Sequence, residues 1–122
     1  MTQAWDLAWK YGDKVVSWQT ASGRVAKAYN APVHSACLLE DESGVAVVEP
    51  TESNRRNAVI FDGDGTERLR LDFPVDEEIV YAFDSMYYVE GKLAAIIATT
   101  RGDFAAVVDP RSGVLSELRP SL

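Results

Sequence analysis

The sequence predicts an all-β domain, an antiparallel meander of about ten to twelve short strands in hairpins. Two observations lead to this prediction. Short runs of β-branched and aromatic residues recur along the whole chain, and clusters of turn residues separate them. Five of these clusters contain a glycine of the kind that tight hairpin turns require, at nearly regular spacing: Gly23, Gly44, Gly65, Gly91 and Gly113. No long helix is expected.

Each strand is assigned from its own pattern of side chains. Residues 68–73 alternate strictly, with Leu69, Leu71 and Phe73 on one face and charged residues on the other. Residues 5–11 also alternate, but Ala4, Trp5, Ala8 and Trp9 would equally fit one face of a helix, and we favour a strand. The expected strands are Trp5–Tyr11, Val15–Gln19, Arg24–Tyr29, Val33–Leu39, Val45–Glu49, Ala58–Asp62, Arg68–Phe73, Ile79–Phe83, Met86–Glu90, Lys92–Thr99, Phe104–Asp109 and Val114–Leu118.

Two strands have apolar residues on both faces. The segments 93–98 and 104–108 show no alternation, so we expect them in the middle of two packed layers. The prolines fall at strand ends or in connections, where a missing N–H breaks no ladder bond. A sandwich, a barrel and a partial-propeller-like stack of small sheets all satisfy this pattern.

Length and charge limit the function. With 122 residues the chain forms one β domain, residues 1–122, and its 12 basic and 19 acidic side chains give a net charge of −7. This charge disfavours nucleic acid and anionic membranes and favours a basic protein partner. The start of the chain lacks a signal peptide, and the longest apolar stretch, residues 93–100, is too short to span a bilayer, so we expect a cytoplasmic protein. The oligomeric state stays open.

The residue types leave little room for catalysis. One cysteine, Cys37, and one histidine, His34, provide neither a disulfide nor a structural zinc site. His34 and Cys37 are three residues apart in one predicted strand, so their side chains point to opposite faces of the sheet. The histidine therefore cannot act as a base for the thiol. Residues 62–67 begin like a calcium loop, but the later ligand positions are absent, so we interpret them as a hairpin turn. We therefore predict no catalytic, cofactor-binding or metal-binding residues.

The predicted partner-binding surface combines two acidic runs with exposed aromatic residues. Each run lies in a connection between strands, where solvated carboxylates make poor acid catalysts but good partners for cations. Tyr87 and Tyr88 are adjacent in a strand, so one of them should point outward and anchor a partner. The expected surface consists of Glu40, Asp41, Glu42, Asp76, Glu77, Glu78, Tyr87 and Tyr88.

Two resemblances add to this interpretation. Trp18–Val25 and Val59–Gly65 resemble hairpin units of bacterial tyrosine-aspartate repeat and propeller-like proteins, in which an aromatic strand runs into an x-x-Gly turn. A small acidic cytoplasmic domain without a catalytic set is also similar in character to immunity proteins that neutralise secreted bacterial toxins. These resemblances imply a hairpin stack that occludes a protein partner.

The expected function is therefore a non-catalytic, acidic binding protein that docks on a basic protein, as an immunity protein docks on a toxin. One alternative is a small hydrolase that uses paired carboxylates or His34, and a deep pocket with two carboxyl groups would favour it. A second alternative is a structural module of a larger assembly.

Overall fold

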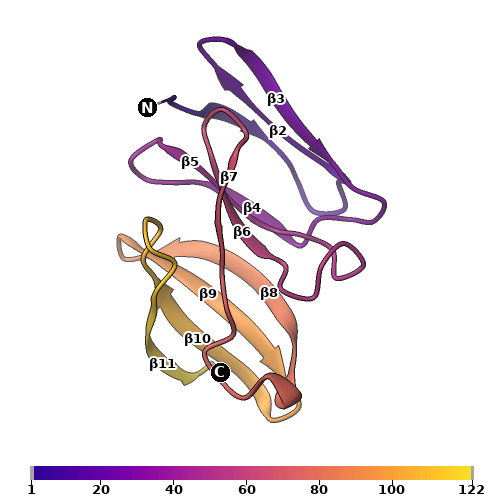
Figure 1. The fold of residues 1–122 in the computed structure, drawn as a ribbon, viewed down its shortest axis with the longest axis vertical. Coiled ribbons are helices and arrows are strands. Elements are labelled where there is room, and N and C mark those ends of the chain that lie inside the picture. Colours follow the sequence, from indigo (N-terminus) through magenta and orange to yellow (C-terminus); the bar gives the residue numbers. More distant parts are fainter. Residues whose placement is uncertain (1, 122) are drawn as a thin grey trace.

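The computed structural model describes residues 2–121, which form eleven strands in three antiparallel sheets (Figure 1). Each sheet is a meander of strands consecutive in sequence. Sheet A contains β1 (Trp5–Ala8), β2 (Val15–Thr20) and β3 (Gly23–Ala28). Sheet B contains β4 (Ser35–Leu38), β5 (Gly44–Val48), β6 (Ala58–Asp62) and β7 (Glu67–Arg70). Sheet C contains β8 (Val80–Val89), β9 (Lys92–Thr99), β10 (Gly102–Val108) and β11 (Leu115–Pro120), and the 3-10 turn η1 (Glu77–Ile79) precedes it.

The all-β prediction is confirmed, and the arrangement is a stack of small sheets. None of the three sheets closes into a barrel. Sheet B lies between the other two along the long axis of the molecule (Figure 1). Among residues 2–121 no helix has the length and hydropathy needed to cross a membrane.

All five glycine-containing turns connect antiparallel neighbours, as predicted. Four of the glycines have positive φ, but Gly44 does not. In that hairpin Glu42 takes the left-handed conformation, with φ of 64°. Gly44 is required for a different reason, because a Cβ atom there would lie 2.0 Å from the carbonyl oxygen of Phe61 on β6.

The prediction of two strands at Ile79–Phe83 and Met86–Glu90 is wrong, because β8 runs through both. The predicted ranges leave Asp84 and Ser85 outside both strands. In the structure the register of β8 against β9 shifts between Val80 and Ala82 and again between Phe83 and Ser85. These irregularities absorb the extra residues and keep the strand continuous.

The N-terminal segment is a strand and not a helix, but it is shorter than predicted. β1 ends at Ala8, because a tight turn follows at once: the Asp13 N–H donates to the Lys10 carbonyl oxygen at 3.0 Å. The Asp13 carboxylate accepts a hydrogen bond from the Lys10 N–H, also at 3.0 Å. β7 likewise ends early, at Arg70 instead of Phe73.

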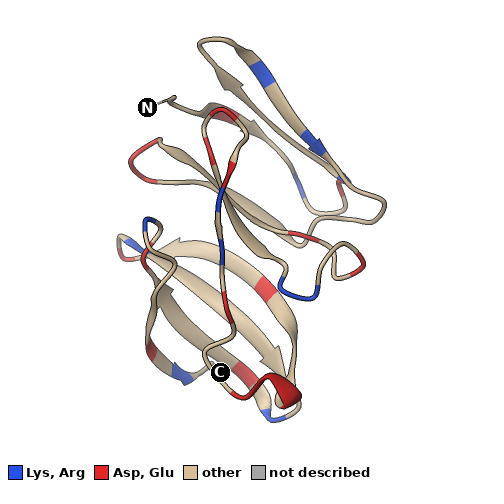
Figure 2. Ribbon diagram, viewed as in Figure 1, with Lys and Arg blue, Asp and Glu red and all other residues tan. Residues whose placement is uncertain are grey.

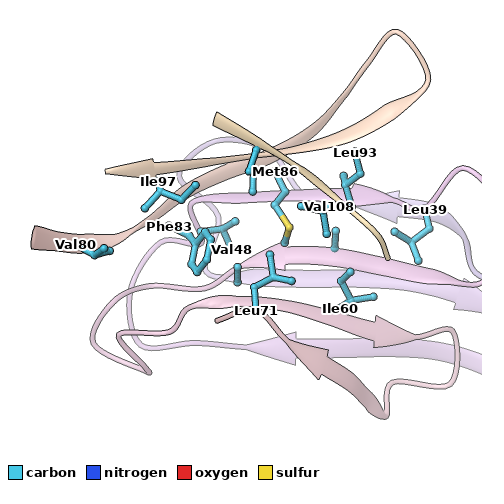
Figure 3. Close-up of a cluster of buried hydrophobic side chains, with 14 residues drawn as sticks. Leu39, Val48, Ile60, Leu71, Val80, Phe83, Met86, Leu93, Ile97 and Val108 are labelled. Atoms are coloured by element: carbon cyan, nitrogen blue, oxygen red, sulfur yellow. The ribbon is translucent and has the colours of Figure 1, made fainter. Parts of the chain in front are cut away.

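Sheet B contributes one face to each of two hydrophobic cores. Alternate residues of β5 and β6 point either to sheet C or to sheet A. The core shared with sheet C is shown in Figure 3, where Val48 and Ile60 meet Phe83 and Met86. The core shared with sheet A contains Val45, Val47, Val59 and Phe61 from sheet B, together with Ala4, Val16, Trp18 and Val33.

Buried polar side chains link the sheets across these cores. The Asn57 side chain is fully buried and bonds to sheet C: its Nδ2 donates to the Phe83 carbonyl and its Oδ1 accepts from the Phe83 N–H, both at 2.9 Å. Between sheets A and B, the Trp18 indole N–H donates to the Gly63 carbonyl oxygen at 2.7 Å. These bonds fix how each sheet sits on the next.

The expectation that segments 93–98 and 104–108 lie between two packed layers holds for one of their faces only. Ala95, Ile97, Ala106 and Val108 belong to the core with sheet B. The alternate residues Ala94, Ile96 and Ala105 belong to neither core, although they are only 6–8% exposed. Because side chains alternate along a strand, these residues face away from sheet B, on the outer face of sheet C.

Candidate partner-binding surface

Three hairpin turns meet around the side chain of Arg68, on β7. Its Nε donates to the Asp62 carboxylate at 2.6 Å, and one terminal nitrogen donates to the Ser43 carbonyl and hydroxyl oxygens at 3.1 and 2.9 Å. The other terminal nitrogen donates to the Pro110 carbonyl oxygen at 3.2 Å. Arg68 therefore joins the β4–β5, β6–β7 and β10–β11 turns into one surface, which we call the turn end.

The β8–β9 turn belongs to the same surface through Tyr88. The Tyr88 hydroxyl accepts a hydrogen bond of 2.9 Å from the Glu40 N–H, and its ring packs against the core between sheets B and C. Burial raises the pKa of Tyr88. The Tyr88 side chain therefore holds the β4–β5 turn against the core. It does not project toward a partner.

Carboxylates outnumber cations at the turn end. Asp62 pairs with Arg68, and Asp41 lies 3.8 Å from Arg111. No other carboxylate of the four turns makes an ion pair within residues 2–121; these are Glu40, Glu42, Asp64, Glu90 and Asp109. The other cations nearby are Lys92, which pairs with Glu117, and Lys27, whose Nζ lies over the Phe61 ring. Figure 2 shows the acidic turns on the ribbon.

Hydrogen bonds within the turns keep several of these carboxylates ionised. The side chain and backbone of Ser43 donate to Asp41 and lower its pKa. Bonds from Thr66 lower the pKa of Asp64, and the Arg111 N–H lowers that of Asp109. Each carboxylate therefore holds its negative charge below the pH at which a free aspartate takes up a proton.

The turn end is shallow. A hollow of about 210 Å³ between the turns is lined by Asp41, Ser43, Arg68 and Arg111. Pockets that enclose small organic ligands are commonly about 300–1,000 Å³. The surface therefore suits contact with another macromolecule better than enclosure of a metabolite.

The second predicted acidic run lies at the other end of sheet C. Asp76 caps η1 by accepting from the Glu78 N–H at 3.1 Å, and Glu77 lies 3.5 Å from both Arg55 and Arg56. η1 leads into the start of β8, whereas Tyr88 is near the strand's end. Ten strand residues at about 3.3 Å each separate the two runs by about 30 Å. The structure therefore divides the predicted surface, and arginines neutralise part of this run.

Tyr87 occupies a third location. It is 45% exposed and lies on the outer face of sheet C, paired with Ala94, while Tyr88 turns inward. The expectation that one of the two tyrosines points outward is confirmed. The outward tyrosine lies on the opposite face of β8 from Tyr88, which makes the bond to the β4–β5 turn.

His34 lies in a separate groove of about 480 Å³, to which all three sheets or their connections contribute. The groove also contains Glu52, Asp84 and Ser85, beside Tyr11, Gly12, Ala31, Pro32 and Val33. No hydrogen bond or ion pair joins His34, Ser85 and the two carboxylates among the described residues, and all but Ser85 are well exposed. Sequence reasoning missed Asp84 and Ser85 here, because only the path of β8 brings them beside the β3–β4 connection.

Cys37 takes no part in the groove. It packs against the core between sheets B and C, and burial raises the pKa of its thiol to about 11. A thiol with so high a pKa is a weak nucleophile at neutral pH. Within residues 2–121 no cluster of His, Cys, Asp and Glu is arranged to hold a metal ion.

Comparisons with known proteins add no identification: no protein-family model, no curated protein and no solved structure matches this chain.

Proposed function

We propose that this protein is a binding protein whose turn end docks on a basic protein partner and occludes it. The observation that carries the proposal is the convergence of four acidic turns into one braced surface. Within residues 2–121, Glu40, Glu42 and Asp64 are exposed and make no ion pair, while Arg68 and Tyr88 bond to the turns that carry them. A surface whose geometry is fixed before contact loses little freedom on binding.

The charge of this surface suits rapid association with a cationic protein. Unpaired carboxylates at the rim of an interface raise the association rate and oppose anionic competitors. Neutralisation of a secreted bacterial toxin in the cytoplasm, as an immunity protein would do, is the biological role we propose for such a surface. Toxins that act on nucleic acid need basic active sites, which a braced acidic surface covers well.

Charge reversal at the two ends of sheet C tests the proposal. The wild-type chain is used to capture proteins from its native cells, and the affinity of a captured basic protein is measured at low and moderate salt. The test variant carries Glu40→Lys and Glu42→Lys. The matched control carries Asp76→Lys and Glu78→Lys, which change the same charge at the opposite end.

We expect the turn-end variant to bind at least tenfold more weakly and to lose most of the salt dependence, while the control binds as the wild type does. Equal losses in both variants would mean that net charge alone drives binding. Unchanged affinity in the turn-end variant would refute the surface. Survival of cells that co-express the partner with the wild-type chain, but not with the turn-end variant, would support the immunity role.

The His34 groove favours a second candidate function, hydrolysis. A histidine, a serine and two carboxylates share one groove of a size that admits a small substrate. The test is turnover of chromogenic ester and glycoside substrates by the wild type and by His34→Ala, Asp84→Asn and Glu52→Gln variants. Turnover that the variants abolish would support this candidate, and its absence across the substrates would oppose it.

A further inference from the structure

One edge of sheet A, the strand β3, presents unused backbone hydrogen-bonding groups. In an antiparallel sheet, residue pairs that exchange two hydrogen bonds alternate with pairs that exchange none. The Tyr29 N–H donates to the Lys14 carbonyl oxygen at 2.9 Å, which fixes this alternation along β3. The N–H and C=O groups of Arg24, Ala26 and Ala28 therefore point away from β2. All three residues are exposed, and within residues 2–121 no strand lies on that side of β3 (Figure 1).

The other sheet edges in the described part of the chain are interrupted or covered. β1 and β11 each have a register shift and a residue with left-handed backbone, Asp6 with φ of 52° and Glu117 with φ of 53°. β7 has four residues and a register shift against β6. β4 and β8 are joined to each other by the Met86 N–H, which donates to the Ser35 hydroxyl at 3.0 Å. β3 pairs over six consecutive residues without a shift, and such an edge accepts an additional strand.

The two cations of β3 are engaged within the molecule. Arg24 donates to the Asp6 carboxylate at 3.0 Å, and Lys27 Nζ lies 4.6 Å from the centre of the Phe61 ring. Edge lysines commonly oppose strand addition, but this one is held on the face toward sheet B. On the outer face Ala26 and Ala28 have only methyl groups, so a neighbouring strand meets no bulky side chain there.

The β6–β7 turn, which belongs to the turn end, lies against the inner face of β3. A Cβ atom on Gly65 of this turn would lie 2.9 Å from the Val25 side chain and 3.7 Å from Lys27 Nζ. Asp64, in the same turn, is exposed and makes no ion pair within residues 2–121. The open edge and the acidic surface are therefore neighbours, and one partner can contact both.

We propose that the basic partner of the turn end adds an extended segment to β3, as a fourth strand of sheet A. This inference rests on the proposed function and specifies how the partner is held. Alternate side chains of the added segment continue the inner row of Val25 and Lys27 toward the turn that carries Asp64. We expect lysine or arginine at these positions of the segment, and small residues at the positions beside Ala26 and Ala28.

Ala26→Pro tests the proposal, because it removes an outward N–H without removing a bond to β2. Ala26→Val is the matched control, since it keeps the N–H and favours a strand. The affinity of both variants is measured for the basic protein captured with the wild-type chain. We expect Ala26→Pro to bind about tenfold more weakly, because a carbonyl group of the added strand loses its donor, and Ala26→Val to bind as the wild type does.

Amide hydrogen exchange of the wild-type chain, alone and with the captured protein, provides a second measurement. Exchange at Arg24, Ala26 and Ala28 should slow at least about tenfold in the complex. Val25 and Lys27 are the internal control, because their N–H groups already bond to β2 and should change less. Circular dichroism and urea unfolding verify that Ala26→Pro folds, and if it does not, amide exchange of the wild type decides.

The outcomes separate strand addition from the turn-end proposal. Weaker binding by the Glu40→Lys and Glu42→Lys variant, with unchanged exchange at β3 and full affinity in Ala26→Pro, would refute strand addition alone. The reverse result would support strand addition and refute the turn end, and capture of no basic protein would refute both. A species of twice the 13.4 kDa chain mass that Ala26→Pro abolishes would make a second copy the occupant, which also overturns the proposal.

Discussion

Replacement of Asn57 by alanine should separate sheet C from sheet B more effectively than loss of most core methyl groups. The side chain is fully buried and makes three bonds of 2.9 Å: two with the Phe83 backbone and one from Nδ2 to the Glu49 carbonyl oxygen. Three lost bonds at about 1 kcal/mol each give about 3 kcal/mol, and backbone groups left without water raise the loss toward about 5 kcal/mol. Domains of this size are stable by only about 5–15 kcal/mol.

Urea unfolding followed by tryptophan fluorescence measures this loss. The unfolding entropy for 122 residues is about 260 cal/mol/K, so a loss of 3 kcal/mol lowers Tm by about 12 °C. Asn54→Ala is the matched control: it lies in the same loop, is exposed, and makes one local bond to the Arg56 N–H. It should cost less than about 1 kcal/mol. A loss below about 1 kcal/mol for Asn57→Ala would refute the role of this side chain in joining the sheets.

Stability should fall in alkali, because the pKa of Cys37 is raised to about 11 and that of Tyr29 is also raised, by burial and by its bond to Glu49. The folded state favours both groups protonated, so the contribution of Cys37 is full below about pH 9 and declines above it by up to about 1.4 kcal/mol per pH unit, and that of Tyr29 begins to decline only above about pH 10. Urea unfolding at pH 8 to 11 tests this, and Cys37→Ala should flatten the curve between pH 9 and 11; a curve that is flat in the wild type would contradict it. Gly44→Ala should cost about 2–3 kcal/mol, because its Cβ would meet the Phe61 carbonyl oxygen. Gly91→Ala, where φ is 79° but the space is open, should cost only about 1 kcal/mol; a loss at Gly44 no larger than the loss at Gly91 would show that the Phe61 carbonyl does not exclude a side chain at Gly44.

Local patterns were sufficient to predict the hairpins. Alternation and glycine positions are patterns among residues that are close in sequence. Each sheet is a meander of consecutive strands, so these short-range patterns predicted five turns of the molecule correctly. These patterns gave wrong or incomplete predictions where a contact between residues distant in sequence determines the local structure. At Asp84 and Ser85 the pairing with β9 overrides a polar dipeptide that looks like a turn, and at Gly44 the backbone of β6 imposes the glycine.

The candidate surface was only half predictable for the same reason. The acidic runs at residues 40–42 and 76–78 could be recognised as exposed turns. Which turns share an end of the molecule depends on how the sheets stack, and that is decided by bonds between distant residues, such as Trp18 to Gly63. Asp64, Glu90 and Asp109 were therefore assigned to the surface only from the structure. The structure also places Tyr87 on a different face from the one predicted.

The central position of sheet B has a consequence for how the molecule comes apart. Both cores contain side chains of β5 and β6, so separation of these two strands disrupts both cores. Separation of the β2–β3 hairpin disrupts only the core between sheets A and B. Amide protons of the middle strands should exchange with solvent only through global opening, and those of sheet A through a smaller, local one. We therefore expect the sheet A end of the molecule to open before its centre.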